Sequence, residues 1–402
     1  MKSTNHSIAH EIRTAAAALA MRTRGPALGL VLSAGLLTAV HAQTLKIGFI
    51  APLTGVGAPW WMAAAEAPKI LAAELNANGG LEVGGKKYRI EVVAYDDQYK
   101  AADSVAAYNR LVNQDGVKYM IVHTSPAAMA LKQNVEDDKV VALTAAATGK
   151  AFDANTKYMF RVVNAPVDYV SSLIPWIKNH YKGSRIAVLN PNDETGWDQA
   201  KLSGSVYKEN GYEVLGNDLY ERSQKDFQPV FTKIIGLKPD VIDLGSTPPA
   251  TAGLMIRQAR ELGYKGLFIK TGGAGPKEIV AAAGPAASEG MISMLYIDPT
   301  NDGYRRVAAA YRKSVGQEPN EMLGSLYDGV NVLLQAIQRA GDVNDTAKVA
   351  ASFAKALPRK SVQGDMLTLG GKSTIGANQQ VMSVTYVGEI KNGQPVVVGK
   401  VN

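Results

Sequence analysis

The sequence predicts an α/β protein made of two lobes, each built around its own parallel β-sheet. Short β-rich runs alternate with helical patterns of roughly 10 to 15 residues, which is typical of βαβ units. The same alternation restarts after Phe160-Arg161-Val162-Val163. The part of the chain that follows residue 42 is also long enough for two domains of ordinary size.

Met1–Ala42 is expected to be a secretory signal peptide rather than part of the fold. Basic residues precede an apolar run over 27–40, and Val40-His41-Ala42 resembles a cleavage site. That run is shorter than the ~20 residues that span a membrane. We therefore expect export with cleavage after Ala42, with an uncleaved signal anchor as the alternative. Without a cysteine near this site, a lipoprotein is not expected.

The first lobe opens with strands rich in β-branched and aromatic residues, separated by helices with one apolar face. Strands are predicted over 45–52, 88–95, 119–123 and 140–143, and helices over 59–76, 101–114 and 126–137.

The second lobe repeats this pattern, and a mixed tail follows. Its helices are predicted over 167–181, 198–210, 227–237 and 248–262, and its strands over 185–190, 240–244 and 266–270, with a further strand opening at Gly211-Tyr212. In the tail, helices are predicted over 304–315, 323–340 and 346–356, and strands over 366–369, 381–389 and 394–401. Lys391-Asn392-Gly393 is expected to be a hairpin turn. The tail is expected to complete both lobes, which requires the chain to cross between them more than once.

Several classes of enzyme and of partner are excluded by composition. The chain has no cysteine, and only His123 and His180 lie beyond the leader, so thiol chemistry and multi-histidine metal sites are not expected. The net charge of +7 comes without a long Lys/Arg block, which argues against nucleic-acid binding. Gly370-Gly371-Lys372-Ser373 and Gly272-Gly273-Ala274-Gly275 lack the spacing of nucleotide-binding loops. We expect no cofactor and no metal.

Thr124-Ser125-Pro126 is the strongest signal for a binding site. It lies between a predicted strand and a predicted helix, with Ser125 as a suitable N-cap and Pro126 as a suitable first helical residue. The amides of Ala127 and Ala128 would then be free donors for a carboxylate. Plain helix capping without a ligand is the alternative.

Other strand ends carry small polar loops that would face the same place. Thr144-Ala145-Ala146-Ala147-Thr148 follows one strand of the first lobe, and the second lobe offers loops at 193–196, at Ser246-Thr247 and at 271–273. Ligands of parallel sheets bind beyond the carboxyl ends of the strands. Of the adjacent Trp60 and Trp61, we expect only one to face a ligand, because neighbouring helical residues point about 100° apart; we assign Trp61 to the core.

Motifs along essentially the whole chain after the leader resemble the type I periplasmic solute-binding proteins of ABC importers, in the Leu/Ile/Val-binding-protein-like group. The matching residues are Ile47-Gly48-Phe49, Pro52-Leu53-Thr54-Gly55, Leu75-Asn76-Ala77-Asn78-Gly79-Gly80, Asp96-Asp97, Phe160-Arg161, Lys225-Asp226-Phe227, Lys238-Pro239-Asp240, Gln258-Ala259, Gly263 and Ser325-Leu326-Tyr327-Asp328-Gly329. The resemblance implies two Rossmann-like lobes joined by a three-segment hinge near Val163, Ser293 and Lys372. The first lobe would comprise 43–163 and 293–371, and the second 164–292 and 372–402.

The resemblance also implies a set of ligand-binding positions. Ser125 corresponds to the serine that holds the ligand carboxylate, and Gly272 stands where the family has an acidic residue for the ligand's amino group. The other positions expected around the ligand are Trp60, Pro126, Ala146, Thr148, Thr195, Trp197, Ser246 and Met322.

The glycine at position 272 favours a ligand that has a carboxylate but no α-amino group. A buried ammonium without an acidic partner is costly, and tryptophans near the site favour a flat apolar body. We therefore expect a hydrophobic or aromatic carboxylic acid, with a branched-chain amino acid as the rival. Asp193, Glu194 or Asp243 could still supply the missing negative charge.

The function that follows is ligand capture for transport. The protein would bind its ligand between two closing lobes in the periplasm and deliver it, as a monomer, to ABC permease subunits in the inner membrane. A ligand sensor of the same fold that feeds a signalling partner is the alternative. An exported α/β enzyme is a second alternative, but no nucleophile, base or metal cluster supports it.

Overall fold

The computed structural model describes residues 43–55 and 58–401, apart from the side chains of Pro59 and Trp60. The expected signal peptide and its cleavage site lie outside these residues. Within them, no helix has both the length and the apolar character needed to cross a membrane.

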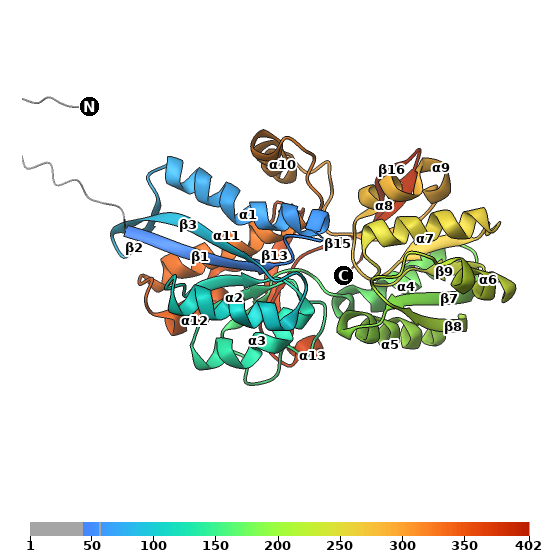
Figure 1. Cartoon of the computed structure of the whole chain (residues 1–402). Helices are drawn as coiled ribbons and strands as arrows, with labels where there is room; N and C mark the ends of the chain where they lie inside the picture. The colour runs from blue at the N-terminus through green and yellow to red at the C-terminus, as the bar shows by residue number, and fades with distance from the viewer. Residues whose placement is uncertain (1–42, 56–57, 402) are drawn as a thin grey trace, which may run out of the picture. The chain divides into compact units, whose positions relative to one another are not determined.

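The first sheet has nine strands, most of them parallel, and is covered by helices on both faces (Figure 1). Its strands, in spatial order, are β12 (Arg359–Lys360), β13 (Met366–Gly370), β14 (Gln380–Met382), β6 (Met159–Arg161), β5 (Val141–Thr144), β4 (Tyr119–Val122), β1 (Gln43–Ala51), β3 (Lys86–Asp96) and β2 (Leu81–Val83). The central strands β4 and β5 are buried at every residue, as expected for a parallel sheet covered on both faces.

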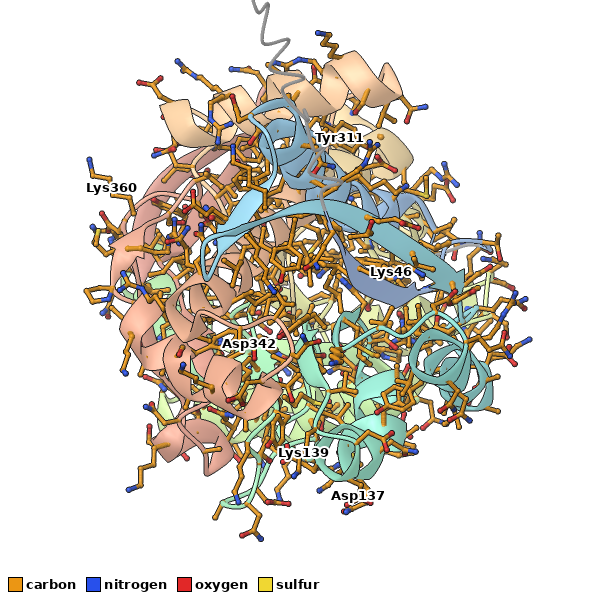
Figure 2. The ribbon with its side chains drawn as sticks, turned by 90° about the vertical axis from the view of Figure 1, so that its left-hand side faces the viewer. Lys46, Asp137, Lys139, Tyr311, Asp342 and Lys360 are labelled. Atoms are coloured by element: carbon orange, nitrogen blue, oxygen red, sulfur yellow. The ribbon has the colours of Figure 1, made fainter. Side chains whose placement is uncertain are left out.

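Two groups of helices enclose this sheet. Helix α1 (Ala58–Ala77) packs on α11 (Met322–Ala340), which in turn packs on α12 (Thr346–Ala356), while α2 (Ala101–Asn113) packs on α3 (Ser125–Asp137). Helix α10 (Asp302–Val315) and the short α13 (Lys372–Ile375) complete this part of the chain. Exposed charged side chains of both signs lie around it, among them Asp137, Lys139 and Asp342 (Figure 2).

The second sheet has seven strands. In spatial order they are β16 (Gln394–Val401), β15 (Thr385–Lys391), β11 (Ile292–Leu295), β10 (Leu267–Lys270), β9 (Val241–Asp243), β7 (Arg185–Pro191) and β8 (Glu213–Tyr220). Its helices are α4 (Pro166–His180), α5 (Glu194–Glu209), α6 (Gln228–Gly236), α7 (Pro249–Glu261), α8 (Pro276–Ala283) and α9 (Pro285–Ser288). The prediction of two α/β lobes with parallel-sheet cores is confirmed.

The chain changes sheet three times. It leaves the first sheet after Arg161, returns after Leu295, and leaves again after Met382. The first change falls between Arg161 and Pro166, in the segment that contains Val163. The other two come later than Ser293 and Lys372, because β11 belongs to the second sheet and β14 pairs with β6 in the first. The lobe boundaries at 163, 293 and 372 otherwise stay a prediction.

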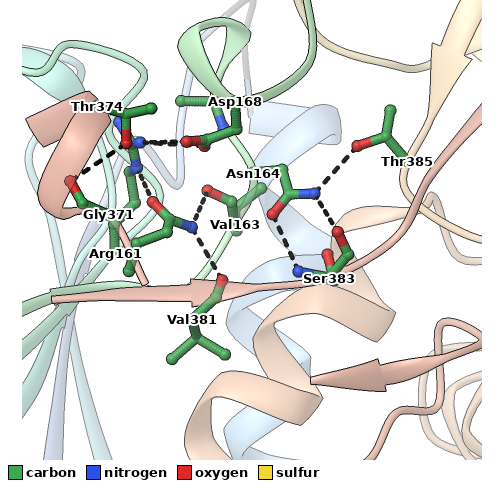
Figure 3. A network of polar contacts seen from close by, with 11 residues as sticks. Arg161, Val163, Asn164, Asp168, Gly371, Thr374, Val381, Ser383 and Thr385 are labelled. Carbon is green, nitrogen blue, oxygen red and sulfur yellow. Dashed lines mark hydrogen bonds and ion pairs between the residues drawn. The ribbon is translucent and has the colours of Figure 1, made fainter. Parts of the chain in front are cut away.

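The predicted strand over 381–389 is wrong as a single element, because it is two strands in different sheets. Ser383 and Val384 separate the two strands. The side chain of Asn164 donates a hydrogen bond to the Ser383 carbonyl (2.6 Å) and accepts one from the Ser383 amide (3.1 Å). This two-way pairing holds two of the crossing segments side by side (Figure 3). The predicted hairpin turn is confirmed: Asn392 and Gly393 have φ of 52° and 70° between β15 and β16, as a type I′ turn requires.

A buried ion pair fixes the first crossing. The guanidinium of Arg161 is fully buried and lies 3.0 Å from Asp168, whose other contact is the amide of Ala165 at the start of α4 (2.7 Å). Arg161 also donates to Gln380 of β14, and Gln380 donates to the carbonyl of Val381 (2.9 Å; Figure 3). Burial lowers the pKa of Arg161, and Asp168 opposes that shift. The pair thus joins β6, β14 and α4.

Replacing Asp168 with Asn should destabilise the protein strongly, because it leaves a buried guanidinium without its counter-ion. We expect the free energy of unfolding to fall by about 3 kcal/mol or more, measured by urea denaturation. Glu318→Gln, which breaks the exposed pair between Arg312 and Glu318 (3.0 Å), is the matched control and should have little effect. Equal losses in the two variants would contradict the role given to the buried pair.

Candidate functional site

A cavity of about 400 Å³ lies at the carboxyl ends of strands from both sheets. Residues that directly follow β1, β3, β4 and β5 line it from the first sheet, and residues that follow β8, β9, β10 and β11 line it from the second. Its volume lies in the range of small-molecule sites, and most of its lining is apolar. The arrangement follows from topology, because parallel strands end at one edge of their sheet.

The start of α3 is a helix cap of a different kind from the one predicted. Thr124, not Ser125, is the N-cap, so Ser125 is the first helical residue and Pro126 the second. The amides of Ala127 and Ala128 are not free donors, because they bond to the hydroxyl (3.4 Å) and the carbonyl (2.9 Å) of Thr124. Thr124 is the N-cap because its hydroxyl accepts a hydrogen bond from the amide of Ala127 in the first turn of the helix.

Ser125 nevertheless lines the cavity and is held as a donor toward it. Its oxygen accepts hydrogen bonds from the amides of Ala147 (3.1 Å) and Thr148 (3.4 Å). A hydroxyl has two acceptor positions and one donor, so these two amides leave its proton available. Among the described residues, no acceptor for that proton is seen. This arrangement leaves Ser125 able to donate a hydrogen bond to a ligand in the cavity, and its role as the carboxylate-binding residue stays a prediction.

The loop after β5 presents other residues than those expected. Ala145 and Ala147 line the cavity, whereas Pro126, Ala146 and Thr148 do not. The hydroxyl of Thr148 donates instead to Asp198 of α5, which also pairs with Lys150 (2.7 Å). These contacts join a loop of the first sheet to a helix of the second.

Trp61, which was assigned to the core, packs there and reaches the cavity as well. The side chain of Trp60, the predicted ligand contact, lies outside what the structure describes. Trp61 meets the ring of His123 edge-on, with 4.6 Å between the centroids.

His123 was not predicted as a site residue, although it lines the cavity. It is fully buried at the end of β4, and neither ring nitrogen has a hydrogen-bond partner among the described residues. Burial lowers its pKa to about 3, so the imidazole is neutral. The sequence signal that could have identified it is a polar residue directly after the apolar strand Tyr119–Val122.

On the side of the second sheet, Thr195, Ser246 and Gly272 line the cavity, as does Met322 at the start of α11. Trp197 does not: it is 46% exposed, and its indole donates to Asn192 (2.8 Å). Asp193 caps α5 and places Thr195 and Trp197 in its first turn, on different sides of the helix.

Gly272 has no room for an acidic side chain. A Cβ built there would lie 2.6 Å from the amide of Ser246, since the loop after β9 fills this space. The amide of Gly272 also donates to the carbonyl of Gly245 (3.1 Å). The glycine is therefore part of the packing of two loops, which sequence reasoning could not foresee.

The charges at the cavity are all positive. Arg222 and Lys270 line it, and no aspartate or glutamate does among the described residues. Asp193 is paired with Arg222, and Asp243 is buried with both oxygens hydrogen-bonded. Asp193, Glu194 and Asp243 were the candidates for a negative charge that could pair with a ligand's amino group, and none of them lines the cavity. In the described part of the chain, no group of three or more His, Asp or Glu side chains could hold a metal ion.

Comparison with known proteins identifies the family. Residues 44–395 match the family described as periplasmic binding protein. The chain belongs to this family. This binding protein is 28% identical over 317 residues to the leucine-, isoleucine-, valine-, threonine- and alanine-binding protein of Pseudomonas aeruginosa, across 78% of this chain and 82% of the relative.

Two solved structures show the same fold. A leucine-binding protein of Thermotoga maritima has a TM-score of 0.77 at 22% identity, and the match covers 89% of this chain and 99% of that one. A solute-binding protein of an ABC transporter from R. palustris, solved with benzoate, has a TM-score of 0.76 at 19% identity, covering 89% and 96%. The family resemblance seen in the sequence is confirmed, and the family is a solute-binding one.

Replacing Ser125 with Ala should weaken binding of a carboxylate ligand about tenfold to a hundredfold, because a hydrogen bond to a charged group is worth about 1.5–3 kcal/mol. Titration calorimetry with the wild-type ligand measures this. Ser203→Ala is the control, since Ser203 is buried in α5 outside the cavity and donates to Gln199 (2.8 Å). Affinity within twofold of wild type for Ser125→Ala would contradict the assignment.

The buried His123 should make the protein less stable in acid. Its pKa of about 3 lies below the ~6.5 of an unfolded histidine. Below pH 6.5 the unfolded chain therefore binds a proton that the folded protein does not. The contribution of His123 to folding stability is complete above pH 6.5 and is lost as the pH falls. The loss approaches about 1.4 kcal/mol per pH unit. In urea unfolding between pH 6.5 and 4.5, His123→Phe should lose less stability than wild type, while the exposed control His180→Gln should follow wild type. Parallel curves for all three proteins would refute this.

Proposed function

We propose that this protein captures a small hydrophobic carboxylic acid that has no α-amino group and delivers it to an ABC importer. The observation that carries the proposal is the charge of the cavity: its lining has Arg222, Lys270 and the Ser125 donor, and no carboxylate among the described residues. A ligand ammonium would have no counter-ion there, and burying it unpaired would cost several kcal/mol.

The ligand's carboxylate is assigned to Ser125. Ser125 offers a hydroxyl proton at the N-terminal end of α3, where the helix dipole favours negative charge. The ligand's body would contact the apolar part of the lining, which includes Trp61, Val163 and Met322. An aromatic or branched aliphatic acid suits this surface.

A branched-chain amino acid is the rival ligand, because curated relatives carry names such as leucine-, isoleucine-, valine-, threonine- and alanine-binding protein. The packing around Gly272 argues against it here. The loop at Gly245-Ser246 occupies the space in which an acidic side chain would have to lie. The benzoate in one structural neighbour is consistent with an acid as ligand in this fold.

In our proposal the protein works as a periplasmic monomer and not as an enzyme. Ligand would stabilise the closed arrangement of the two lobes, in which Asp198 meets Thr148 and Lys150, and the closed form would dock on permease subunits. A sensor that reports ligand to a signalling partner would use the same cavity. Loss of uptake of the bound acid on deleting the permease would separate transport from sensing.

A ligand panel tests the chemistry directly. The full chain is expressed with its own leader, purified from the periplasmic fraction, and its thermal unfolding is followed with matched pairs: leucine against 4-methyl-2-oxopentanoate, phenylalanine against phenylpyruvate, and benzoate. We expect the acids to stabilise, by about 2.7 kcal/mol at 100 times the dissociation constant, and the amino acids to have no effect. Stabilisation by the amino acids alone would overturn the ligand class but not the transport role.

A further inference from the structure

Lys270 is a buried cation that the proposed carboxylate site at Ser125 does not use. It ends β10, is 2% exposed and lines the cavity from the second sheet, whereas Ser125 lines it from the first. Its ammonium donates to the carbonyls of Gly272 (2.7 Å) and Gly273 (3.0 Å). An ammonium has three donors, so one remains for a further partner.

No carboxylate of the described residues pairs with this ammonium. Asp243 is near, but its oxygens accept from the amides of Gly245 (2.9 Å) and Thr271 (3.1 Å) and from the hydroxyls of Tyr207 and Thr271. Glu321 accepts from the amide of Tyr296 (2.7 Å). Both residues act on Lys270 from a distance and raise its pKa, yet burial outweighs them and lowers the pKa to about 7. Buried lysines are rarely left unpaired.

The other cation of the cavity is already compensated. Arg222 pairs with Asp193 and donates to the hydroxyl of Tyr99 (3.1 Å). Among the described lining residues, Lys270 is therefore the cation without an ion pair, and it lines the cavity from the second sheet, whereas Ser125 lines it from the first.

We propose that the ligand carries a second carboxylate and that Lys270 is its counter-ion. The ligand class is then a small dicarboxylate with an apolar body, held by Ser125 from the first sheet and by Lys270 from the second. Since each sheet supplies one anion partner, a dianion would draw the two lobes together, which a monoacid does only in part. This inference rests on the proposed function and narrows it from a carboxylic acid to a diacid.

The test compares acids that differ only in the second charge. Calorimetric titration of the protein, expressed with its own leader and purified from the periplasmic fraction, would use 1,4-benzenedicarboxylate against 4-methylbenzoate, and heptanedioate against heptanoate. We expect wild type to bind at least one of the diacids tenfold or more tighter than its partner. In Lys270→Met that preference should disappear while affinity for the monoacid is kept or rises. Lys277→Met, which removes an exposed lysine at the start of α8, should behave as wild type.

Each outcome separates the inference from the proposed function. Equal binding of diacid and monoacid by wild type would overturn the diacid and leave the carboxylic acid standing. Binding of amino acids alone would overturn both. If Lys270→Met weakens both acids equally, Lys270 only anchors the 271–273 loop and the inference fails. The comparison of diacid with monoacid on wild type needs no variant. It therefore still tests the inference if Lys270→Met does not fold.

Discussion

The buried pair between Arg161 and Asp168 is the interaction on which the rest of the structure depends. It sits where the chain first leaves the nine-stranded sheet, and through Gln380 it also holds the strand from which the chain leaves a second time. An unpaired charge in the interior is costly, so this pair restricts where the crossing segments can run. The crossings in turn bring the carboxyl ends of both sheets to one cavity.

Backbone packing leaves no room for an acidic side chain at position 272 of the cavity lining. Gly272 lies against the loop at Gly245-Ser246, and the lysine two residues earlier bonds to carbonyls of the same turn. Negative side chains near the site are turned to other partners: Asp193 to Arg222, and Asp243 to Thr271 and Tyr207. The result is a mainly apolar cavity with excess positive charge, which is the environment that an organic anion requires.

Much of the candidate site could be located from the sequence, because its place is set by strand ends. Ser125, Thr195, Ser246, Gly272 and Met322 follow from that rule or from the family resemblance, and the structure lines the cavity with them. Details at the scale of one hydrogen bond could not be foreseen. Thr124 takes the cap expected of Ser125, and Thr148 turns to Asp198, because each choice depends on a neighbour's geometry.

The sequence by itself determined the α/β class, the two-lobe division and the position of the strand ends, since these depend on local hydrophobic patterns and turn residues that act over a few positions. Only the tertiary structure decided that, among the described residues, Lys270 is buried without a carboxylate partner and His123 without a hydrogen-bond partner, and that the strand expected over 381–389 divides between two sheets. Those properties arise from segments that lie far apart in the chain, such as Asn164 and Ser383. Their contacts are set by packing between the sheets, which no local pattern encodes.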